Sequence, residues 1–488
     1  MERQGMQPNL LKDKDYRSEA GVEPRGMSGE RSFSKAETEG RDGLNEQGKL
    51  LEAILSRENM NLAYIRVTDN AGSAGIDGMK TEDLLPYLKE HGVRLIDDLL
   101  TGRYRPQAVK RVEIPKPDGG KRGLGIPTVI DRMIQQAISQ QLTPIFDVGF
   151  SAHSYGFRPG RNAHQAIKQA TVYINEGYKV VVDIDLEKFF DRVNHDNLMH
   201  LVSKKVADKR VLRLIRRYLE SGVMVVGVFE QSTEGTPQGG PLSPLLSNIM
   251  LDELDKELER RGHRFCRYAD DCNIYVRSKR SAERVMSGIS KFIEEELKLK
   301  VNKTKSEVGS PKQRKFLGFS FYSKEKSKVG VRIHPKSVER VKEKVRKLTG
   351  RSNAMSMEQR IKKLSSLTTG WTSYFRLADM KRHCQELDEW MRRRLRMCHW
   401  KDWKKISAKF SNLMKLGIDK SKAWQYANTR KGYWRIAHSP ILQRTLTNDY
   451  FEQLELTTFS QAYLRFSNFT NRPVPNGTQG GVRGQVGE

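Results

Sequence analysis

Two adjacent aspartates at the tip of a predicted β-hairpin constrain this chain more than any other feature. The sequence RYADDCNIYV, residues 267–276, places Asp270 and Asp271 between two segments that alternate as β-strands do. Two like charges held side by side repel, and each raises the pKa of the other. The pair is therefore a solvated turn, an acidic pair that falls in a loop, or a site for a divalent cation, which takes carboxylate oxygens as ligands.

A second acidic segment favours the cation site. The run VVVDIDLEKFF ends a predicted strand with Asp183 and Asp185, which share a face because side chains alternate along a strand. A lone acid at such a place is more often a helix N-cap than a ligand. Carboxylates from neighbouring strands, however, can hold two metal ions about 4 Å apart for in-line phosphoryl transfer. Asp185 and the pair Asp270–Asp271 are the carboxylates that we predict to meet.

The charge balance indicates an anionic polymer as the partner. The chain has 87 Lys and Arg against 59 Asp and Glu, a formal net charge of +28, which is typical of proteins that bind nucleic acid. A negatively charged membrane surface is the competing partner. Because no uninterrupted apolar span approaches the ~20 residues of a transmembrane helix, we expect nucleic acid and no membrane.

Cysteine usage bears on the compartment. No pair of cysteines has the short spacing of a zinc site, and the four are Cys266, Cys272, Cys384 and Cys398. We expect free, buried thiols in a reducing compartment. The N-terminal residues lack the apolar segment of a secretory signal, so we predict a cytoplasmic protein.

Hydrophobic patterning divides the 488 residues into segments. Strand and helix patterns mix up to about residue 330, whereas the pattern beyond is almost wholly helical, so the fold class is α+β followed by an α-helical domain. The predicted segments are a disordered leader (1–48), a mixed module (49–330), a basic helical domain (331–430), a small C-terminal extension (431–470) that is a candidate for contacting DNA, and a disordered tail (471–488).

Several local signals predict particular elements. Helical spacing from Lys49 places Leu51, Ile54, Leu55, Leu62 and Ile65 together. Strands VKRVEIPK and KRGLGIP flank a turn at Asp118-Gly119-Gly120.

Four further helices are predicted from caps and stripes. One begins near Asn162, and a second covers EKFFDRVNHDNLMHLV. A third begins at Ser243 as the N-cap with Pro244 next, and a fourth begins at the capping box SMEQ of residues 356–359.

Six blocks in this order resemble a known family. They are IPKPDGGKRGLGIP, SYGFRPGRNAHQAI, DIDLEKFFD, GTPQGGPLSPLLSNIMLDELD, RYADD and KFLGFSF. Together they resemble the bacterial group II intron-encoded reverse transcriptases/maturases, and the resemblance covers about residues 50–430. It implies a right-hand polymerase, with fingers and palm in residues 49–330 and a helical thumb, the maturase domain X, in residues 331–430. No paired cysteines follow Cys398, so the resemblance does not include the zinc-dependent HNH endonuclease that ends many relatives.

The resemblance implies roles for the acidic residues. Asp185, Asp270 and Asp271 match the catalytic, metal-binding triad, with Asp185 and Asp270 contacting both ions and Asp271 less directly. Leu186 would offer its backbone carbonyl to the second ion. Two Mg²⁺ ions are implied, with Mn²⁺ as a substitute, for RNA-directed DNA synthesis from dNTPs.

The nucleotide contacts are carried over in the same way. Phe190 matches an aromatic that would collide with a 2′-hydroxyl, although core packing is the alternative for Phe189 and Phe190. The other matches are Lys116 and Arg122 on the triphosphate, Gln238 in a loop where Gly239 and Gly240 allow close approach, and Lys305, with Lys303 as an equal rival, near pyrophosphate. KFLGF resembles a primer grip, and apolar sheet packing is its alternative.

The basic helical domain resembles the part that grips nucleic acid. The predicted RNA and template-primer contacts are Gly239, Arg158, Arg392, Arg393, Arg396 and Lys404. The implied partners are the intron RNA, an RNA template with its DNA primer, and target DNA, in a nucleoid-associated protein that assists splicing and retrohoming. Two alternatives remain, which are an RNA-binding splicing factor without polymerase activity and a reverse transcriptase recruited to defence or repair.

Overall fold

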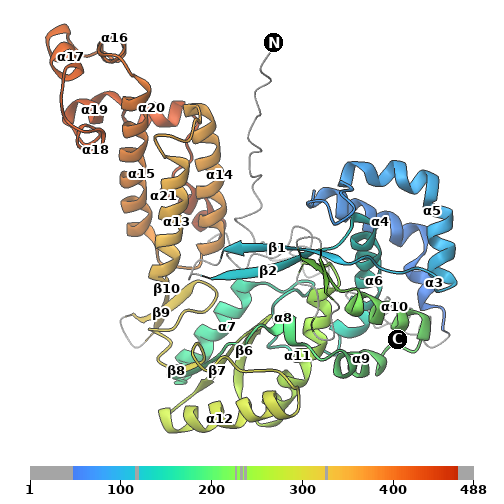
Figure 1. Cartoon of the computed structure of the whole chain (residues 1–488). Coiled ribbons are helices and arrows are strands. Elements are labelled where there is room, and N and C mark those ends of the chain that lie inside the picture. The colour runs from blue at the N-terminus through green and yellow to red at the C-terminus, as the bar shows by residue number, and fades with distance from the viewer. Residues whose placement is uncertain are drawn as a thin grey trace, which may run out of the picture. The chain divides into compact units, whose positions relative to one another are not determined.

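The computed structural model describes residues 48–115, 120–225, 228–230, 235, 239–324 and 328–470 (Figure 1). The chain forms two compact units, one of residues up to 317 with 323–329, and one of residues 318–322 with those from 330 onward. The predicted leader and tail, Lys116, Gln238 and most of the turn after Pro115 lie outside the described residues.

The N-terminal part of the first unit consists mainly of helices. The predicted stripe from Lys49 is interrupted, because Ser56 caps a second helix by accepting a hydrogen bond from the Asn59 N–H. Leu62 and Ile65, which share that helical spacing, are exposed. The elements are α3 (Leu50–Ile54), α4 (Arg57–Asp69), η1 (Thr81–Asp83), α5 (Leu84–Leu100) and α6 (Val129–Asp147).

A four-stranded sheet contains the predicted hairpin. Strands β1 (Val109–Pro115) and β2 (Lys121–Ile126) pair antiparallel, with Val112 opposite Leu124. The sheet order is β2-β1-β4-β5, where β4 is Val223–Val225 and β5 is Val228–Glu230. Gly120, at the end of the turn, has a φ of +82°, which glycine adopts without strain.

A second four-stranded sheet carries the acidic residues. Its order is β6-β7-β3-β8, with antiparallel neighbours, and the strands are β6 (Arg264–Tyr268), β7 (Asp271–Val276), β3 (Val180–Ile184) and β8 (Glu307–Gly309). Helices α7 (Ala163–Asn175) and α11 (Ser243–Arg260) pack on β6, and α12 (Lys279–Glu295) packs on β3, β7 and β8. One continuous hydrophobic core joins β3, β6, β7, α11 and α12 to the N-terminal helices.

The predicted helix starts are partly confirmed. Asn162 caps α7 with a capping box to Gln165, as expected. Ser243 is not the N-cap of α11, because Leu242 occupies that place without a side-chain cap. The segment predicted as one helix after Glu187 is broken, because Asn194 caps a new helix. The resulting elements are α8 (Phe189–Arg192), α9 (His195–Ser203) and, further on, α10 (Lys209–Glu220).

The second unit is mainly helical. It begins with the two-stranded sheet of β9 (Phe319–Ser323) and β10 (Val329–Ile333). Its long helices are α13 (Pro335–Leu348), α14 (Met357–Phe375) and α15 (Lys381–Asp402), and the predicted capping box of Ser356 and Gln359 begins α14. Along α15 an apolar face is buried at Leu387, Met391, Leu395 and Cys398.

Residues 431–470 pack against those long helices. Helix α18 contacts α15, and α21 contacts both α14 and α15. The shorter helices of the unit are α16 (Ile406–Lys415), α17 (Lys420–Ala427), α18 (Tyr433–Ile436), α19 (Pro440–Thr445), α20 (Asn448–Gln453) and α21 (Phe459–Thr470). All four cysteines are free and buried, as predicted. Across the described ranges, no helix has the length and apolar character to cross a membrane.

Candidate active site

The turn that carries the paired aspartates is short and strained. Tyr268 pairs with Asp271, which leaves Ala269 and Asp270 as a two-residue loop between β6 and β7. Ala269 has a φ of +55°, a left-handed conformation that costs a residue with a Cβ about 1–2 kcal/mol. Strained backbone of this kind persists only where the surroundings hold it. The turn therefore depends on its neighbours.

Register places Asp185 directly beside this turn. In the antiparallel pair of β3 and β7, Ile184 lies opposite Cys272, so the next residue, Asp185, comes level with Asp271. Its carboxylate accepts a hydrogen bond of 2.9 Å from Asn302 Nδ2, and its N–H donates to Ser306 Oγ at 3.0 Å. The pairing of β3 with β7 thus brings Asp185 beside the paired aspartates, as predicted, and Asn302 orients the Asp185 carboxylate.

The electrostatics of the site show crowded negative charge. Desolvation raises the pKa of Asp183 to about 6, although the charge of Arg314 opposes this shift. Desolvation and then the negative charges of Asp270 and Asp183 raise the pKa of Asp271, which Lys315 partly offsets. Carboxyls that destabilise one another in this way are stabilised as anions by a nearby cation.

The donor atoms suit a hard divalent cation. Carboxylate oxygens of Asp185, Asp270 and Asp271 are the ligands that Mg²⁺ takes. Leu186 forms a bridge with Val301 that is flanked by hydrogen bonds from Glu187 N–H to Lys300 O and from Asn302 N–H to Asp185 O. In this pattern the Leu186 carbonyl points away from Val301.

Side-chain positions do not yet form a closed metal cage. Among residues that the structure describes, no three His, Cys, Asp or Glu side chains converge closely enough to hold an ion. The backbone nevertheless brings the predicted carboxylates to adjacent ends of β3 and β7, the two inner strands of the sheet.

A buried ion pair lies behind the turn. Arg267 and Asp255, both essentially without exposed side chain, form a bidentate pair with N–O distances of 2.7 and 2.5 Å. Arg267 Nη1 also donates to Asn248 Oδ1 at 3.0 Å and to the carbonyl of Ala269 at 3.1 Å. Desolvation raises the pKa of Asp255, but a guanidinium keeps its proton. A permanent cation therefore holds the strained residue by its carbonyl.

The loop before α7 closes the same network. Tyr155 N–H donates to Arg267 O, and Arg267 N–H donates to His153 O, each at 2.9 Å. Asn248 Nδ2 donates to the carbonyl of Gly156 at 3.0 Å. A Cβ at Gly156 would lie 2.5 Å from the Ala269 nitrogen, so only glycine allows this approach.

Sequence reasoning missed these supporting residues. Asn248 and Asp255 lie two turns apart on α11, on the face that also buries Leu254 and Leu258. Polar residues repeated on an apolar helix face were a usable signal for a buried network. Nothing in the sequence indicated that Asn302 would contact Asp185.

The predicted nucleotide contacts differ in how the structure places them. Phe189 is buried in the core, whereas Phe190 is half-buried with its ring 5.2 Å from that of Phe189. Lys305, like Lys303, is exposed in the turn before β8. Gly239 has a φ of +131°, and a Cβ there would lie 2.6 Å from the Gly125 carbonyl of β2. Arg122 pairs with Ile114 through its backbone.

Among the predicted nucleic-acid contacts, Arg158 has another role. It is buried, its Nε lies 2.6 Å from Asp147 Oδ1, and its guanidinium donates to the carbonyls of Asp147, Ser151 and Ser154. This arginine fixes the loop before α7. Its guanidinium is occupied by these contacts and only 5% of the residue is exposed, and its role as a nucleic-acid contact stays a prediction.

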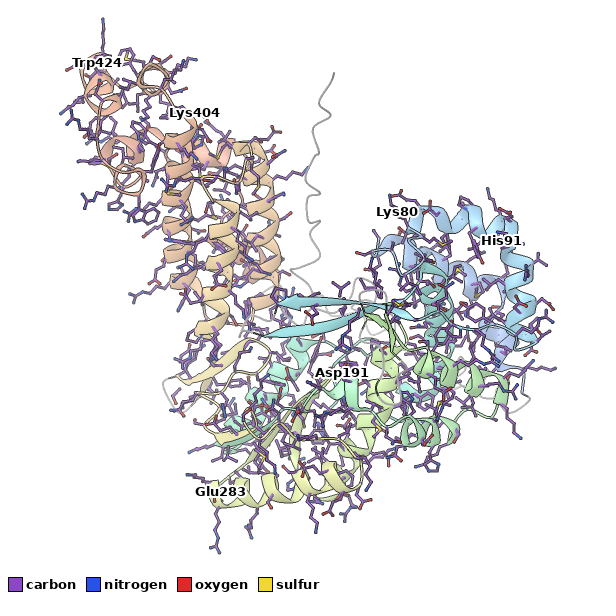
Figure 2. All side chains as sticks on the ribbon, viewed as in Figure 1. Lys80, His91, Asp191, Glu283, Lys404 and Trp424 are labelled. Carbon is purple, nitrogen blue, oxygen red and sulfur yellow. The ribbon has the colours of Figure 1, made fainter. Side chains whose placement is uncertain are left out.

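The basic residues of α15 are used in several ways. Arg396 donates to the carbonyl of Leu446 at 3.0 Å, and desolvation lowers its pKa to about 10. Arg393 donates to the carbonyl of Trp434 at 3.1 Å. Arg392 is half-buried, and Lys404, beyond the end of α15, is exposed (Figure 2).

Two families match the chain in separate regions. Residues 114–321 match the family described as reverse transcriptase (RNA-dependent DNA polymerase). Residues 338–417 match the maturase-specific domain of group II introns. The first region contains every acidic residue of the site, and the second lies within the helical unit.

Individual relatives agree with these matches. Protein YkfC of Escherichia coli is 33% identical over 276 residues, which are 49% of this chain and 72% of YkfC. The group II intron-encoded protein LtrA of Lactococcus lactis is 35% identical over 209 residues, which are 43% of this chain and only 35% of LtrA. A solved telomerase from Candida albicans is 12% identical, with a TM-score of 0.37, over 67% of this chain and 65% of that one. The assignment of the chain to a family rests on the sequence matches and not on this structural similarity.

We predict that Arg267→Met lowers the free energy of unfolding by about 3–5 kcal/mol, because it leaves the Asp255 carboxylate buried without its cation. The double variant Arg267→Met/Asp255→Met should recover most of that stability, since no charge is left buried. Primer extension should stay low in both variants, because the Ala269 carbonyl has lost its donor. Denaturant unfolding and extension over a Mg²⁺ titration measure the two effects. Full activity in the double variant would refute the positioning role.

We predict that Gly156→Ala reduces primer extension at least about tenfold while costing only about 1–3 kcal/mol of stability. The added methyl meets backbone atoms of Tyr268 and Ala269 at 3.0 Å or less, so the turn must shift. Gly92→Ala is the control, because a Cβ there meets nothing within 4 Å. Equal activity of the two variants, measured on one annealed substrate, would contradict the prediction.

Proposed function

The chain belongs to the group II intron-encoded reverse transcriptases/maturases, an RNA-directed DNA polymerase family, and we propose that the carboxylates Asp185, Asp270 and Asp271, at the ends of β3 and β7, catalyse this DNA synthesis. We further propose that the helical unit binds the group II intron RNA and assists its splicing and mobility. One observation carries the proposal. The register of β3 and β7 brings Asp185 level with the turn of Asp270 and Asp271, inside the matched reverse transcriptase region.

The proposed cofactor is a pair of Mg²⁺ ions. Asp185, Asp270, Asp271 and the Leu186 carbonyl would hold them. When bound, such ions neutralise the triphosphate and lower the pKa of the primer 3′-hydroxyl. We propose that the substrates of the reaction are dNTPs, added to a DNA primer on an RNA template.

The chain's own residues position this chemistry. Asn302 fixes one oxygen of Asp185, and Arg267 fixes the backbone between the strand and Asp270. A site whose backbone is held in this way needs no backbone rearrangement when negative charge develops in the transition state. We propose that Phe190, half-buried against Phe189, presents the remaining part of its ring to the sugar of the incoming nucleotide.

A splicing factor without polymerase activity is the second candidate. The maturase-specific match of residues 338–417 supports RNA binding under either proposal. The elaborate support of a strained acidic turn favours the polymerase, because an idle site has no need of a strained Ala269. Primer extension by the wild-type chain separates the two, since an idle splicing factor binds RNA without extending the primer.

We predict that Asp270→Asn reduces primer extension by about 10²–10⁴-fold, the factor that several kcal/mol of transition-state stabilisation represents. The amide keeps the size of the side chain but loses the charge that holds a cation. Asp191→Asn is the control, because Asp191 is an exposed acid on nearby α8 (Figure 2). RNA affinity, measured by filter binding, should be the same in all three proteins. Normal extension by Asp270→Asn would remove the proposed active site.

We predict that Phe190→Val increases incorporation of ribonucleotides relative to deoxynucleotides by roughly 10–100-fold, the range that loss of a steric contact allows. Phe190→Tyr should retain discrimination because it keeps the ring. Single-nucleotide extension with rNTP and dNTP measures the ratio of kcat/KM values. An unchanged ratio in Phe190→Val would assign Phe190 to core packing alone.

A further inference from the structure

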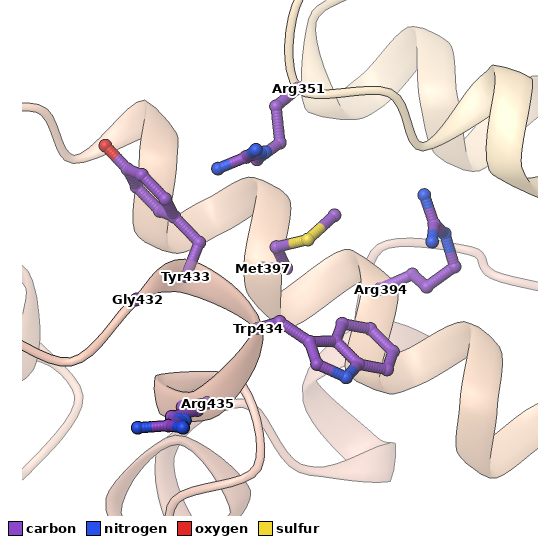
Figure 3. A pocket seen from close by; sticks show the side chains of 7 residues that line it. All are labelled: Arg351, Arg394, Met397, Gly432, Tyr433, Trp434 and Arg435. Carbon is purple, nitrogen blue, oxygen red and sulfur yellow. The ribbon is translucent and has the colours of Figure 1, made fainter.

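A hollow in the second unit is lined by residues of the basic helical domain and of the C-terminal extension, and none of the individually predicted contacts Arg392, Arg393, Arg396 and Lys404 lines it. Its volume is ≈ 730 Å³, within the range of ~300–1,000 Å³ that holds small ligands. Figure 3 shows Met397 of α15 between Tyr433 and Arg351 on one side and Trp434 and Arg394 on the other. The lining therefore combines flat aromatic rings with guanidinium groups.

The two aromatic side chains are held in place but remain accessible. Tyr433 and Trp434 are 37% and 38% exposed, at the start of α18. Ile436, the last residue of that helix, and Ala437 after it are buried, which anchors the helix. The guanidinium of Arg393 lies 3.9 Å from the centre of the Trp434 ring and donates to its carbonyl. One face of the indole is thus covered, and the exposed remainder offers the other face.

The cations of the hollow are also fixed. Arg394 Nε donates to Thr349 Oγ1 at 2.5 Å, and the Arg351 guanidinium lies 4.9 Å from the centre of the Tyr433 ring. Within the described part of the chain, no carboxylate forms an ion pair with Arg351 or Arg394. Elsewhere on α15, by contrast, Arg382 pairs with Glu386 at 3.0 Å. The hollow therefore has positive charge that a ligand can neutralise.

These features together specify the ligand chemistry. Guanidinium groups without a carboxylate suit a phosphate, and an accessible ring face suits a base, since stacking is available to every base. Bases within a duplex already have both faces covered by their neighbours. A ligand that offers a phosphate and a free base face to one small hollow is an unpaired nucleotide.

We propose that this hollow binds one unstacked nucleotide of a single-stranded nucleic acid, with its base against Trp434 or Tyr433 and its phosphate between Arg351 and Arg394. The inference rests on the proposed role of the helical unit in binding RNA and adds a single-strand site to it. It lies in residues 349–351, 394–397 and 433–434, of which the last pair falls outside the matched maturase region of residues 338–417. RNA and DNA share the base and phosphate, so the test includes both.

The experiment measures fluorescence anisotropy of labelled oligonucleotides on the full-length chain, without dNTPs. The probes are unstructured oligo(U), oligo(dT) and a blunt RNA duplex of equal length. Trp434→Ala should weaken single-strand binding at least about fivefold, the lower end of what one stacked base contributes, and leave duplex binding unchanged. Trp434→Phe should restore single-strand binding because it retains an aromatic face.

Matched variants control for charge and for surface tryptophan. Trp424→Ala removes a 59% exposed tryptophan of α17 (Figure 2), away from the hollow, and should change nothing. Arg351→Ala should make the dependence of log affinity on log salt shallower by about 0.7 for single strands, whereas Arg382→Ala should not. If Trp434→Ala weakens the binding of oligo(U) but not of oligo(dT), the site is assigned to RNA. Equal weakening of both assigns it to single-stranded RNA and DNA alike.

Three outcomes would overturn the inference. They are unchanged single-strand affinity in Trp434→Ala, an equal loss of duplex affinity, and full displacement of oligo(U) from the hollow by poly-glutamate at matched charge, which would indicate an acidic protein partner. Primer extension by the wild-type chain is assayed in parallel, because the anisotropy measurement contains no dNTPs and does not depend on polymerase activity. A failed polymerase assay and a failed hollow assay therefore give different results.

Discussion

The buried ion pair between Arg267 and Asp255 is the interaction on which the acidic site depends. Burial of both charges costs free energy, which only close pairing and complete hydrogen bonding can offset. The structure meets that condition with a bidentate pair, the amide of Asn248 and the carbonyl of Ala269. Three segments of the chain, the hairpin, α11 and the loop before α7, are thereby joined at one guanidinium. The acidic turn can keep its strained conformation because its neighbours cannot separate.

This arrangement fixes the backbone that carries the acidic residues. The register of β3, β7 and β8 and the contact at Gly156 fix the backbone at Asp185 and at the turn. The carboxyls repel one another, and desolvation and neighbouring charges raise the pKa of Asp271. A fixed backbone with mutually repelling carboxylates suits the cation binding that we propose for this site.

The sequence predicted the parts of this structure that depend on local patterns. Alternation identified the strands around Asp271, the cap at Asn162 and the box at Ser356 were confirmed, and the ordered blocks identified the family. It is less informative where tertiary contacts decide. Leu62 and Ile65 follow helical spacing yet are exposed, and Arg158 lies in a family block yet is buried in a salt bridge. The network of Arg267 and Asn248 joins residues that are distant along the chain, so no local pattern contained it.

The net positive charge of the chain does not tell which individual basic residues form the surface that binds nucleic acid. Arg158 and Arg267 are buried and stabilise loops, and Arg396 donates to the carbonyl of Leu446. Net charge still draws an anionic polymer toward the protein at long range, but contacts require cations whose donors are not already used inside. Arg351 meets that requirement beside the exposed ring of Tyr433, and Arg394 pairs with no carboxylate of the described residues, although its Nε donates to Thr349. For an arginine-rich chain, the unpaired cations next to flat apolar surfaces are therefore better evidence of a nucleic-acid site than the total charge.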